Sequence, residues 1–132
     1  MQKDFKIGQS NELIKEGSLF DIHNHYKFAS IILKENGRLL VAFEPTVEHS
    51  KDGLSVLLEF ETVNFLEFNL QFAKKDDAIV DEFGYKSVGD MDDNWLLTEA
   101  QATKDDHFFI RFFGGGFIRV QSEKARLHVG AN

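Results

Sequence analysis

Residues 66–72 read Leu66-Glu67-Phe68-Asn69-Leu70-Gln71-Phe72, a run in which every second side chain is apolar. Successive side chains of an extended strand point to opposite faces of a sheet, whereas the apolar face of a helix repeats every three or four residues. The alternation therefore predicts a β-strand that buries its apolar side chains on one face and exposes its polar side chains on the other.

The sequence on the N-terminal side of this stretch has the same period. Residues 54–61 and residues 28–34 also alternate between two faces. Glu35-Asn36-Gly37 supplies a turn between residues 28–34 and the apolar run 38–43, which predicts a hairpin. The chain also holds 14 Phe, a residue type that suits the half-buried surface of a sheet.

The other expected elements are shorter. Further strands are expected at residues 79–85, 95–102, 108–113, 117–120 and 127–129. A single helical turn is the alternative for the first of them. Near the N-terminus, Ser10 is placed to cap a short helix through Leu13 and Ile14, which Gly17 would end.

These elements predict the fold class and the number of domains. The expected fold is mainly β: an antiparallel β-sandwich or partly open barrel of about eight to ten strands, with a short N-terminal helix. No repeat or flexible linker divides the sequence. Residues 1–132 are therefore expected to form a single all-β domain.

Charge is unevenly distributed along the chain, whose formal net charge is -7. Residues 74–106 carry 4 basic and 10 acidic side chains, whereas residues 107–132 carry 4 basic and 1 acidic. An acidic surface repels nucleic acid and steers basic partners toward it. We therefore expect no nucleic-acid partner, although arginines and phenylalanines are interleaved in the basic tail.

Composition also bears on compartment and catalysis. The chain contains no Cys, its N-terminus lacks the apolar region of a signal peptide, and its longest apolar runs are far shorter than a membrane span. These features predict a cytoplasmic protein with no membrane partner. No nucleophile motif is present, and paired carboxylates such as Glu59 and Glu61 equally suit a wet strand face. We therefore expect neither enzyme activity nor a cofactor.

The segment Asp21-Ile22-His23-Asn24-His25 holds candidate metal ligands. On an extended strand Asp21, His23 and His25 would share one face, and two imidazoles with a carboxylate suit a divalent metal. A full coordination shell would need a further histidine from elsewhere in the chain. The alternative is two histidines at the rim of a loop with no metal.

Part of the same region resembles the first cupin motif, through Gly17, His23-Asn24-His25 and Gly37. The resemblance implies a cupin-like β-barrel that binds a metal or a small ligand. Ala29 and Ser30 stand where cupins place a metal-binding glutamate, and the second cupin motif is missing.

A broader pattern combines Leu19-Phe20-Asp21 with Leu58-Glu59-Phe60-Glu61-Thr62-Val63-Asn64-Phe65-Leu66. It resembles the layout F-H-D … F-x-x-V-x-x-L of small all-β bacterial domains that include immunity proteins of polymorphic toxin systems. Phe20 stands at or beside the position of a family histidine, so no functional residue is carried over. The resemblance implies a non-catalytic protein that binds and neutralises a partner toxin.

The acidic segment would be the binding surface of such a protein. Its charge would steer the chain toward a basic toxin domain and accelerate association. The predicted partner-binding residues are Asp76, Asp77, Asp81, Glu82, Asp90, Asp92, Asp93, Asp105 and Asp106. We expect a monomer or a small homo-oligomer, the latter formed through a sheet edge or an exposed phenylalanine patch.

Overall fold

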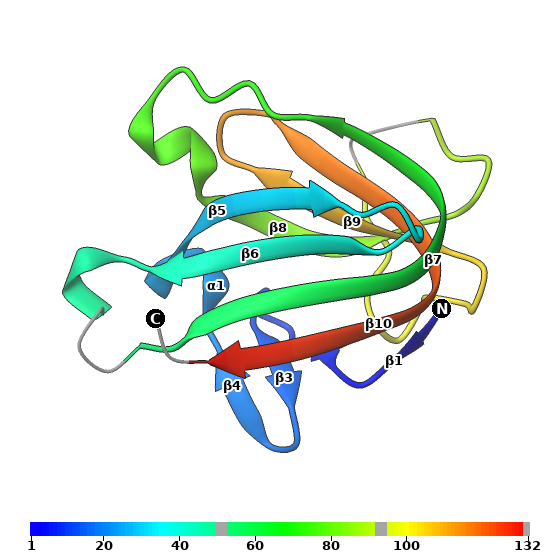
Figure 1. The fold of residues 1–132 in the computed structure, drawn as a ribbon, viewed down its shortest axis with the longest axis horizontal. Helices are drawn as coiled ribbons and strands as arrows, with labels where there is room; N and C mark the ends of the chain where they lie inside the picture. The colour runs from blue at the N-terminus through cyan, green and yellow to red at the C-terminus, as the bar shows by residue number, and fades with distance from the viewer. Residues whose placement is uncertain (50–52, 92–94, 131–132) are drawn as a thin grey trace.

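The computed structural model describes residues 1–49, 53–91 and 95–130, and in these residues the chain is mainly β. Figure 1 shows one large sheet that curls into a half-barrel, with a small three-stranded sheet beside it and one short helix. The prediction of a mainly β fold with a partly open barrel is confirmed.

Ten strands, one α-helix and two turns of 3-10 helix lie in the described residues. In chain order they are β1 (Gln2–Lys3), β2 (Lys6–Ile7), β3 (Leu13–Lys15), β4 (Ser18–Phe20), α1 (Ile22–His25), β5 (Tyr26–Leu33), β6 (Leu39–Pro45), η1 (Val47–His49), β7 (Ser55–Asn69), η2 (Lys75–Ala78), β8 (Val80–Lys86), β9 (His107–Phe112) and β10 (Phe117–Gly130). The small sheet consists of β2, β3 and β4, and the other strands form the large sheet.

The two longest strands, β7 and β10, form the spine of the large sheet, whose order is β5-β6-β7-β10-β9-β8. They pair antiparallel from Ser55 opposite Gly130 to Asn69 opposite Phe117. β6 pairs with the first half of β7, and β9 pairs with the first half of β10. β1 adds to the second half of β10 as a short parallel strand. The two halves of β10 therefore have different outer neighbours, β9 and β1, whereas β6 borders only the first half of β7.

An irregularity in the middle of the spine accounts for the curl of the sheet. The register of β10 shifts between Gln121 and Ser122, and Thr62 on the facing strand adopts a left-handed φ of 57°. A bulge of this kind bends a strand and increases its twist. The second half of β7 consequently leaves β6 and turns away from it (Figure 1).

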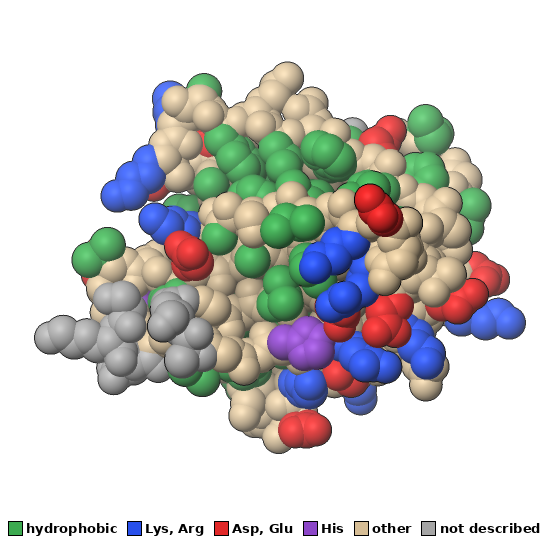
Figure 2. All heavy atoms as spheres, in the orientation of Figure 1, with side chains coloured by type: hydrophobic (Ala, Val, Ile, Leu, Met, Phe, Trp, Pro, Cys, Tyr) green, Lys and Arg blue, Asp and Glu red, His purple; other side chains and the backbone are tan. Residues whose placement is uncertain are grey.

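This bend leaves a gap in the half-barrel, which we call the open seam. It lies between β5 on one side and residues 63–69 of β7 on the other. Figure 2 shows hydrophobic side chains gathered in the upper part of this face, above the part of the sheet formed by β5 and β6. Leu33 and Phe68 contribute to the exposed apolar surface of the seam.

Phenylalanines fill the space that the curled sheet encloses. Phe108 lies near the centre, with ring centroids 5.9 Å from Phe5, 5.6 Å from Phe60 and 6.0 Å from Phe83. Such offset and edge-on contacts are the favoured geometries of aromatic pairs. The high phenylalanine content therefore serves the core, because burial of each such side chain contributes about 1.5–3 kcal/mol.

The predicted N-terminal helix exists, but its predicted position is wrong. Leu13 and Ile14 belong to β3, because Glu16 and Gly17 have φ values of 52° and 81° and form a tight two-residue turn into β4. The helix lies instead at Ile22–His25. Within the described part of the chain, no helix is long and apolar enough to cross a membrane.

The predicted division of the longest strands is also wrong. Residues 54–61 and 66–72 were expected as two strands, but β7 runs as one strand from Ser55 to Asn69. Phe68 is 50% exposed, because the second half of β7 has a neighbour on one side only. Likewise, 117–120 and 127–129 both belong to β10.

The strands expected at residues 79–85 and at residues 95–102 have opposite outcomes. The strand expected at residues 79–85 is present as β8, Val80–Lys86, and the alternative of a helical turn is wrong. Residues 95–102 were expected to be a strand, but only Leu97 pairs, as an isolated bridge to Tyr85.

Candidate functional site

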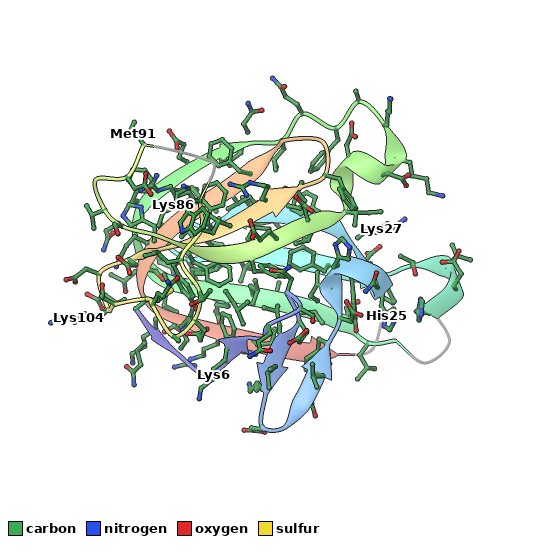
Figure 3. All side chains as sticks on the ribbon, turned by 180° about the vertical axis from the view of Figure 1, so that it is seen from behind. Lys6, His25, Lys27, Lys86, Met91 and Lys104 are labelled. Atoms are coloured by element: carbon green, nitrogen blue, oxygen red, sulfur yellow. The ribbon has the colours of Figure 1, made fainter. Side chains whose placement is uncertain are left out.

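Three exposed apolar side chains lie on the loop that follows β8. Val88, Met91 and Trp95 are 61%, 87% and 72% exposed. Figure 3 shows Met91 at one end of the molecule, on the loop that continues from Lys86, with His25 at the opposite end. We call residues 87–91 and 95–97 the anchored loop, because two buried cations hold its backbone.

Arg119 of β10 is the first of these cations. Its Nη1 donates a hydrogen bond to the carbonyl of Asp90 (2.7 Å), and its Nη2 donates to the carbonyl of Ser87 (3.0 Å). Its Nε donates to Nδ1 of His107 (2.9 Å). Hydrogen bonds from a charged donor are stronger than neutral ones. One buried guanidinium therefore fixes the loop backbone at two points.

Lys86, the last residue of β8, is the second cation and is fully buried. Its Nζ donates to the carbonyl of Trp95 (3.0 Å) and lies 3.7 Å from a carboxylate oxygen of Asp90. The ammonium also lies 5.4 Å from the ring centre of Phe109. A buried charge is costly unless it is paired, and these groups compensate it. Lys86 thus fixes the far end of the anchored loop.

His107 completes the arrangement beneath the loop. It is buried, and its ring stacks on Phe65 with the ring centroids 4.6 Å apart. Because a guanidinium can only donate, Nδ1 of His107 accepts from Arg119 and the ring is neutral. Burial is the main cause that lowers the pKa of His107, and the charge of Arg119 lowers it further, while Asp106 opposes the shift.

The arrangement fixes a backbone and leaves its apolar side chains in solvent. Ordering loops and side chains on binding costs free energy, so a loop that is already ordered binds more tightly. Tryptophan is also among the residue types that carry most binding energy in protein interfaces. The anchored loop is therefore suited to contact another protein.

The predicted acidic binding residues fall into two groups. Asp76 and Asp77 lie on η2 and Asp81 and Glu82 on β8, whereas Asp90, Asp105 and Asp106 lie in the connection from β8 to β9. Asp92 and Asp93 fall outside the described residues. The structure therefore places the described members at both ends of β8 instead of in one continuous group.

Several of these carboxylates make contacts within the chain. Asp106 is buried and accepts a hydrogen bond from the amide of Thr103 (2.7 Å). An oxygen of Glu82 lies 2.8 Å from Nη1 of Arg111. Asp105, in contrast, is exposed. Less charge faces a partner than the number of acidic residues suggests.

The predicted metal ligands do not share a face. Asp21 caps α1, and His23 and His25 lie within this helix rather than on a strand. Nδ1 of His23 lies 2.6 Å from the carbonyl of Val80, whereas the ring of His25 stacks on His49 with centroids 3.8 Å apart. Among the described residues, no group of three His, Asp or Glu side chains is placed to hold a metal ion.

Glu59 faces two basic residues and Glu61 faces one. Buried Glu59 accepts a hydrogen bond from Nε of Arg38, and its other oxygen lies 2.8 Å from Nε2 of His128. The contact with His128 is the main cause that lowers the pKa of Glu59; burial opposes it, and Arg38 lowers the pKa further. Glu61 lies 3.8 Å from Arg126. The two carboxylates therefore link neighbouring strands.

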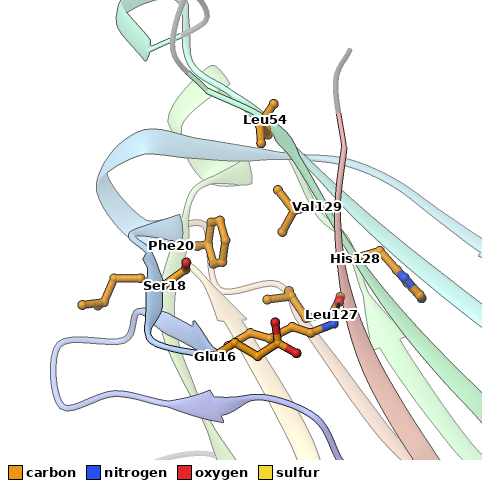
Figure 4. A pocket seen from close by; sticks show the side chains of 9 residues that line it. Glu16, Ser18, Phe20, Leu54, Leu127, His128 and Val129 are labelled. Atoms are coloured by element: carbon orange, nitrogen blue, oxygen red, sulfur yellow. Dashed lines mark hydrogen bonds between the residues drawn. The ribbon is translucent and has the colours of Figure 1, made fainter.

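A cavity of about 760 Å³ opens between β4 and the end of β10 (Figure 4). Phe20, Leu54 and Val129 give it an apolar wall. Lys15 also lines it, and its Nζ donates to the carbonyl of Leu127 (2.7 Å). The volume is in the range of small-molecule sites.

Sequence reasoning did not single out Lys86 or Trp95, and it considered Arg119 only as part of a basic tail. The sequence does contain one sign of the anchored loop: the apolar residues Val88, Met91 and Trp95 lie within an acidic segment. Comparison of the chain with protein-family models, curated proteins and solved structures finds no match.

Proposed function

We propose that the chain is a non-catalytic protein-binding domain that docks on a basic protein through the anchored loop. The observation that carries the proposal is the exposure of Met91 and Trp95 on a backbone held by buried Arg119 and Lys86. A fixed, solvent-facing tryptophan supplies the kind of aromatic anchor that dominates many interfaces.

The charge of the surrounding sequence supports a basic partner. The segment 74–106 that contains the loop carries 10 acidic and 4 basic side chains. Asp105, which lies in the same connection from β8 to β9 as the loop, is exposed, whereas Asp90 lies close to buried Lys86. Asp76 is also exposed but lies at the other end of β8. Complementary charges of this kind raise the rate of encounter more than they deepen affinity.

Within this class, the more specific proposal is an immunity protein that neutralises a toxin by covering part of its surface. Its support is the resemblance of residues 19–21 and 58–66 to small all-β immunity proteins, together with a fold that is mainly β. Neutralisation by binding needs no catalytic group in this chain.

The test is calorimetric titration of the chain with the protein encoded directly upstream of its gene. Trp95→Ala should weaken binding by about 2 kcal/mol, because it removes the aromatic anchor. The matched control is Leu19→Ala, at an exposed residue of β4, which should leave binding unchanged. An upstream product that does not bind would refute the immunity function. Equal binding by Trp95→Ala would show that the anchored loop is not the interface.

A cupin-like, small-ligand-binding barrel is the second candidate, favoured by the cavity between β4 and β10. Apolar Phe20, Leu54 and Val129 match a small apolar ligand. The ammonium of Lys15 lies 3.0 Å from a carboxylate oxygen of Asp4, so its charge is already paired within the chain. Native mass spectrometry and elemental analysis of untagged protein test this candidate. Protein that carries neither a small molecule nor a metal would count against it.

A further inference from the structure

The outer edge of β8 is covered by other parts of the chain. The amide of Phe83 donates to Oδ1 of Asn11 (3.1 Å). Tyr85 and Leu97 exchange two backbone hydrogen bonds, of 3.0 and 2.8 Å. Covering an edge in this way prevents its pairing with a strand of another molecule.

The edge of β10 beyond β9 is covered as well. β1 pairs with it at Lys124 and Ala125. Past the end of β1, the amide of Leu127 donates to Oδ1 of Asp4 (2.9 Å), and its carbonyl accepts from Nζ of Lys15 (2.7 Å). Two side chains thus occupy the hydrogen-bonding positions of a missing strand.

The two strand edges that face the open seam are not covered in this way. In the described residues β5 pairs only with β6, and the second half of β7 pairs only with β10. The carbonyl of Gly37 accepts the amide of Val63 (2.9 Å) and closes one end. Along the rest of the described seam, no strand pairs with either of the two facing edges (Figure 1).

The spacing of the seam is wider than that of paired strands. The Cα atoms of β5 and β7 lie more than 8 Å apart almost everywhere. Neighbouring strands in a sheet are about 4.8 Å apart. β5 and β7 are thus too far apart to pair with each other, and each keeps an edge for another strand.

Apolar side chains line the seam. Leu33 on β5 and Phe68 on β7 are 59% and 50% exposed. Near the first residues of β5, away from Leu33, Phe28, Phe72 and Phe112 contact one another, with ring centroids 5.4–5.6 Å apart. The seam therefore combines two strand edges with an apolar floor that is only partly covered.

We infer that the open seam is a strand-acceptor site for an extended segment of another protein, with apolar side chains at every second position. An extended strand can pair its backbone with both facing edges while its apolar side chains cover Leu33 and Phe68. A helix or a small molecule would leave the edges unpaired. The open seam contains none of the residues of the anchored loop. A test of the seam is therefore independent of the proposed function.

The experiment uses an acetylated, amidated peptide of alternating Thr and Val, with amide hydrogen exchange followed by NMR. The peptide should slow the exchange of amides in β5 and in the second half of β7 together. An analogue N-methylated at alternate residues keeps the side chains but loses half of its donors, and it should bind about tenfold more weakly.

Variants of the protein separate strand pairing from general apolar binding. Phe68→Ser removes an exposed ring, and Leu33→Pro removes an edge amide. Each should weaken peptide binding by about tenfold. Leu19→Ser, at an exposed residue outside the seam, is the control and should bind as the wild type does. Circular dichroism verifies that each variant is folded, and Phe68→Ser carries the test if Leu33→Pro is not.

Three results would overturn the inference. Equal binding of the N-methylated analogue would mean that the seam is merely an apolar surface. Unchanged exchange of the seam amides at millimolar peptide would mean that it accepts no strand. A concentration-dependent dimer that protects the same amides would exclude a foreign partner and assign the seam to a second copy of the chain.

Discussion

Three basic side chains lie close together beneath the anchored loop: Lys86, His107 and Arg119. Lys86 and His107 are cross-strand neighbours on β8 and β9, and Arg119 reaches His107 from β10. Protonation of His107 would place another positive charge beside these cations and remove the acceptor that Arg119 uses. The neutral imidazole is therefore a requirement of the folded state.

Stability should fall as His107 becomes protonated. A histidine with a lowered pKa in the fold stabilises the protein above its ordinary pKa of about 6.5, and this contribution is lost as the pH falls below that value. Urea titrations should therefore give a lower free energy of unfolding at about pH 5 than at about pH 7. His107→Asn keeps an acceptor that does not titrate, so its pH dependence should be shallower. Equal slopes would contradict this role.

Glu99 links the N-terminal strands to the core. Its carboxylate accepts hydrogen bonds from the amide of Ile7 (2.8 Å), the hydroxyl of Tyr85 (2.7 Å) and the ammonium of Lys3 (3.0 Å). Burial by itself raises the pKa of Glu99, but these hydrogen bonds outweigh it and hold the pKa below its usual value. The charged form is therefore the one that stabilises the fold.

Glu99→Gln should lower the free energy of unfolding by about 1–3 kcal/mol at neutral pH. The difference from wild type should shrink as the pH falls through the pKa of the carboxyl group, because the wild type then loses the same charge. Urea denaturation at several pH values measures both effects. Exposed Glu123→Gln is the control and should change stability by less than about 0.5 kcal/mol.

At the scale of elements, the order of the anchored loop can be followed through Trp95, the one tryptophan of the sequence. Lys86→Met keeps most of the aliphatic stem but removes the donor to the Trp95 carbonyl. In this variant the fluorescence anisotropy of Trp95 should fall, and acrylamide should quench the fluorescence of Trp95 more efficiently. Lys27→Met, at an exposed residue of β5, is the control. Unchanged anisotropy in Lys86→Met would show that Lys86 does not order the loop.

The hairpin of β5 and β6 was predictable because alternation and the turn Glu35-Asn36-Gly37 agree. The helix was misplaced because its signals are ambiguous. A glycine in the left-handed region, such as Gly17, ends a helix or forms the tight turn of a hairpin equally well. Burial of Leu13 against the core favours the strand.

The anchored loop was only partly predictable. The apolar residues Val88, Met91 and Trp95 are visible in the sequence, but their anchors come from other strands. Lys86 and Arg119 meet the loop through the register of β8, β9 and β10, which no local pattern specifies. The same limit applied to His23 and His25, whose assumed strand is a helix.

At the scale of the whole molecule, one core side chain should dominate stability. Phe108→Ala should lower the free energy of unfolding by about 3–5 kcal/mol, because it leaves a cavity among rings from several strands. Phe113→Ala, at a residue that is half exposed, is the control and should cost less than about 1 kcal/mol. Urea denaturation of both variants measures the difference, and similar losses would refute the central position of Phe108.

The exposed carboxylates of residues 74–106 should act on the rate of association. Reversing the exposed carboxylates in Asp76→Lys with Asp105→Lys should slow association with the upstream protein and flatten its dependence on salt. Stopped-flow measurement of Trp95 fluorescence gives the rates. Glu16→Lys, on the turn between β3 and β4, is the control. Unchanged rates at low salt would remove the steering role.

The position of β10 in the sheet has a consequence for biosynthesis. β10 pairs with β1, β7 and β9, and the ribosome makes all three before it. The nascent chain therefore emerges as a β5-β6-β7 piece and a β8-β9 piece, and the strand that pairs with both is still missing. Until residues 117–130 have left the exit tunnel, these pieces expose apolar faces to the chaperones that bind unfinished chains. Translation that stops short of β10 therefore leaves β7 and β9 without the strand that joins them into one sheet.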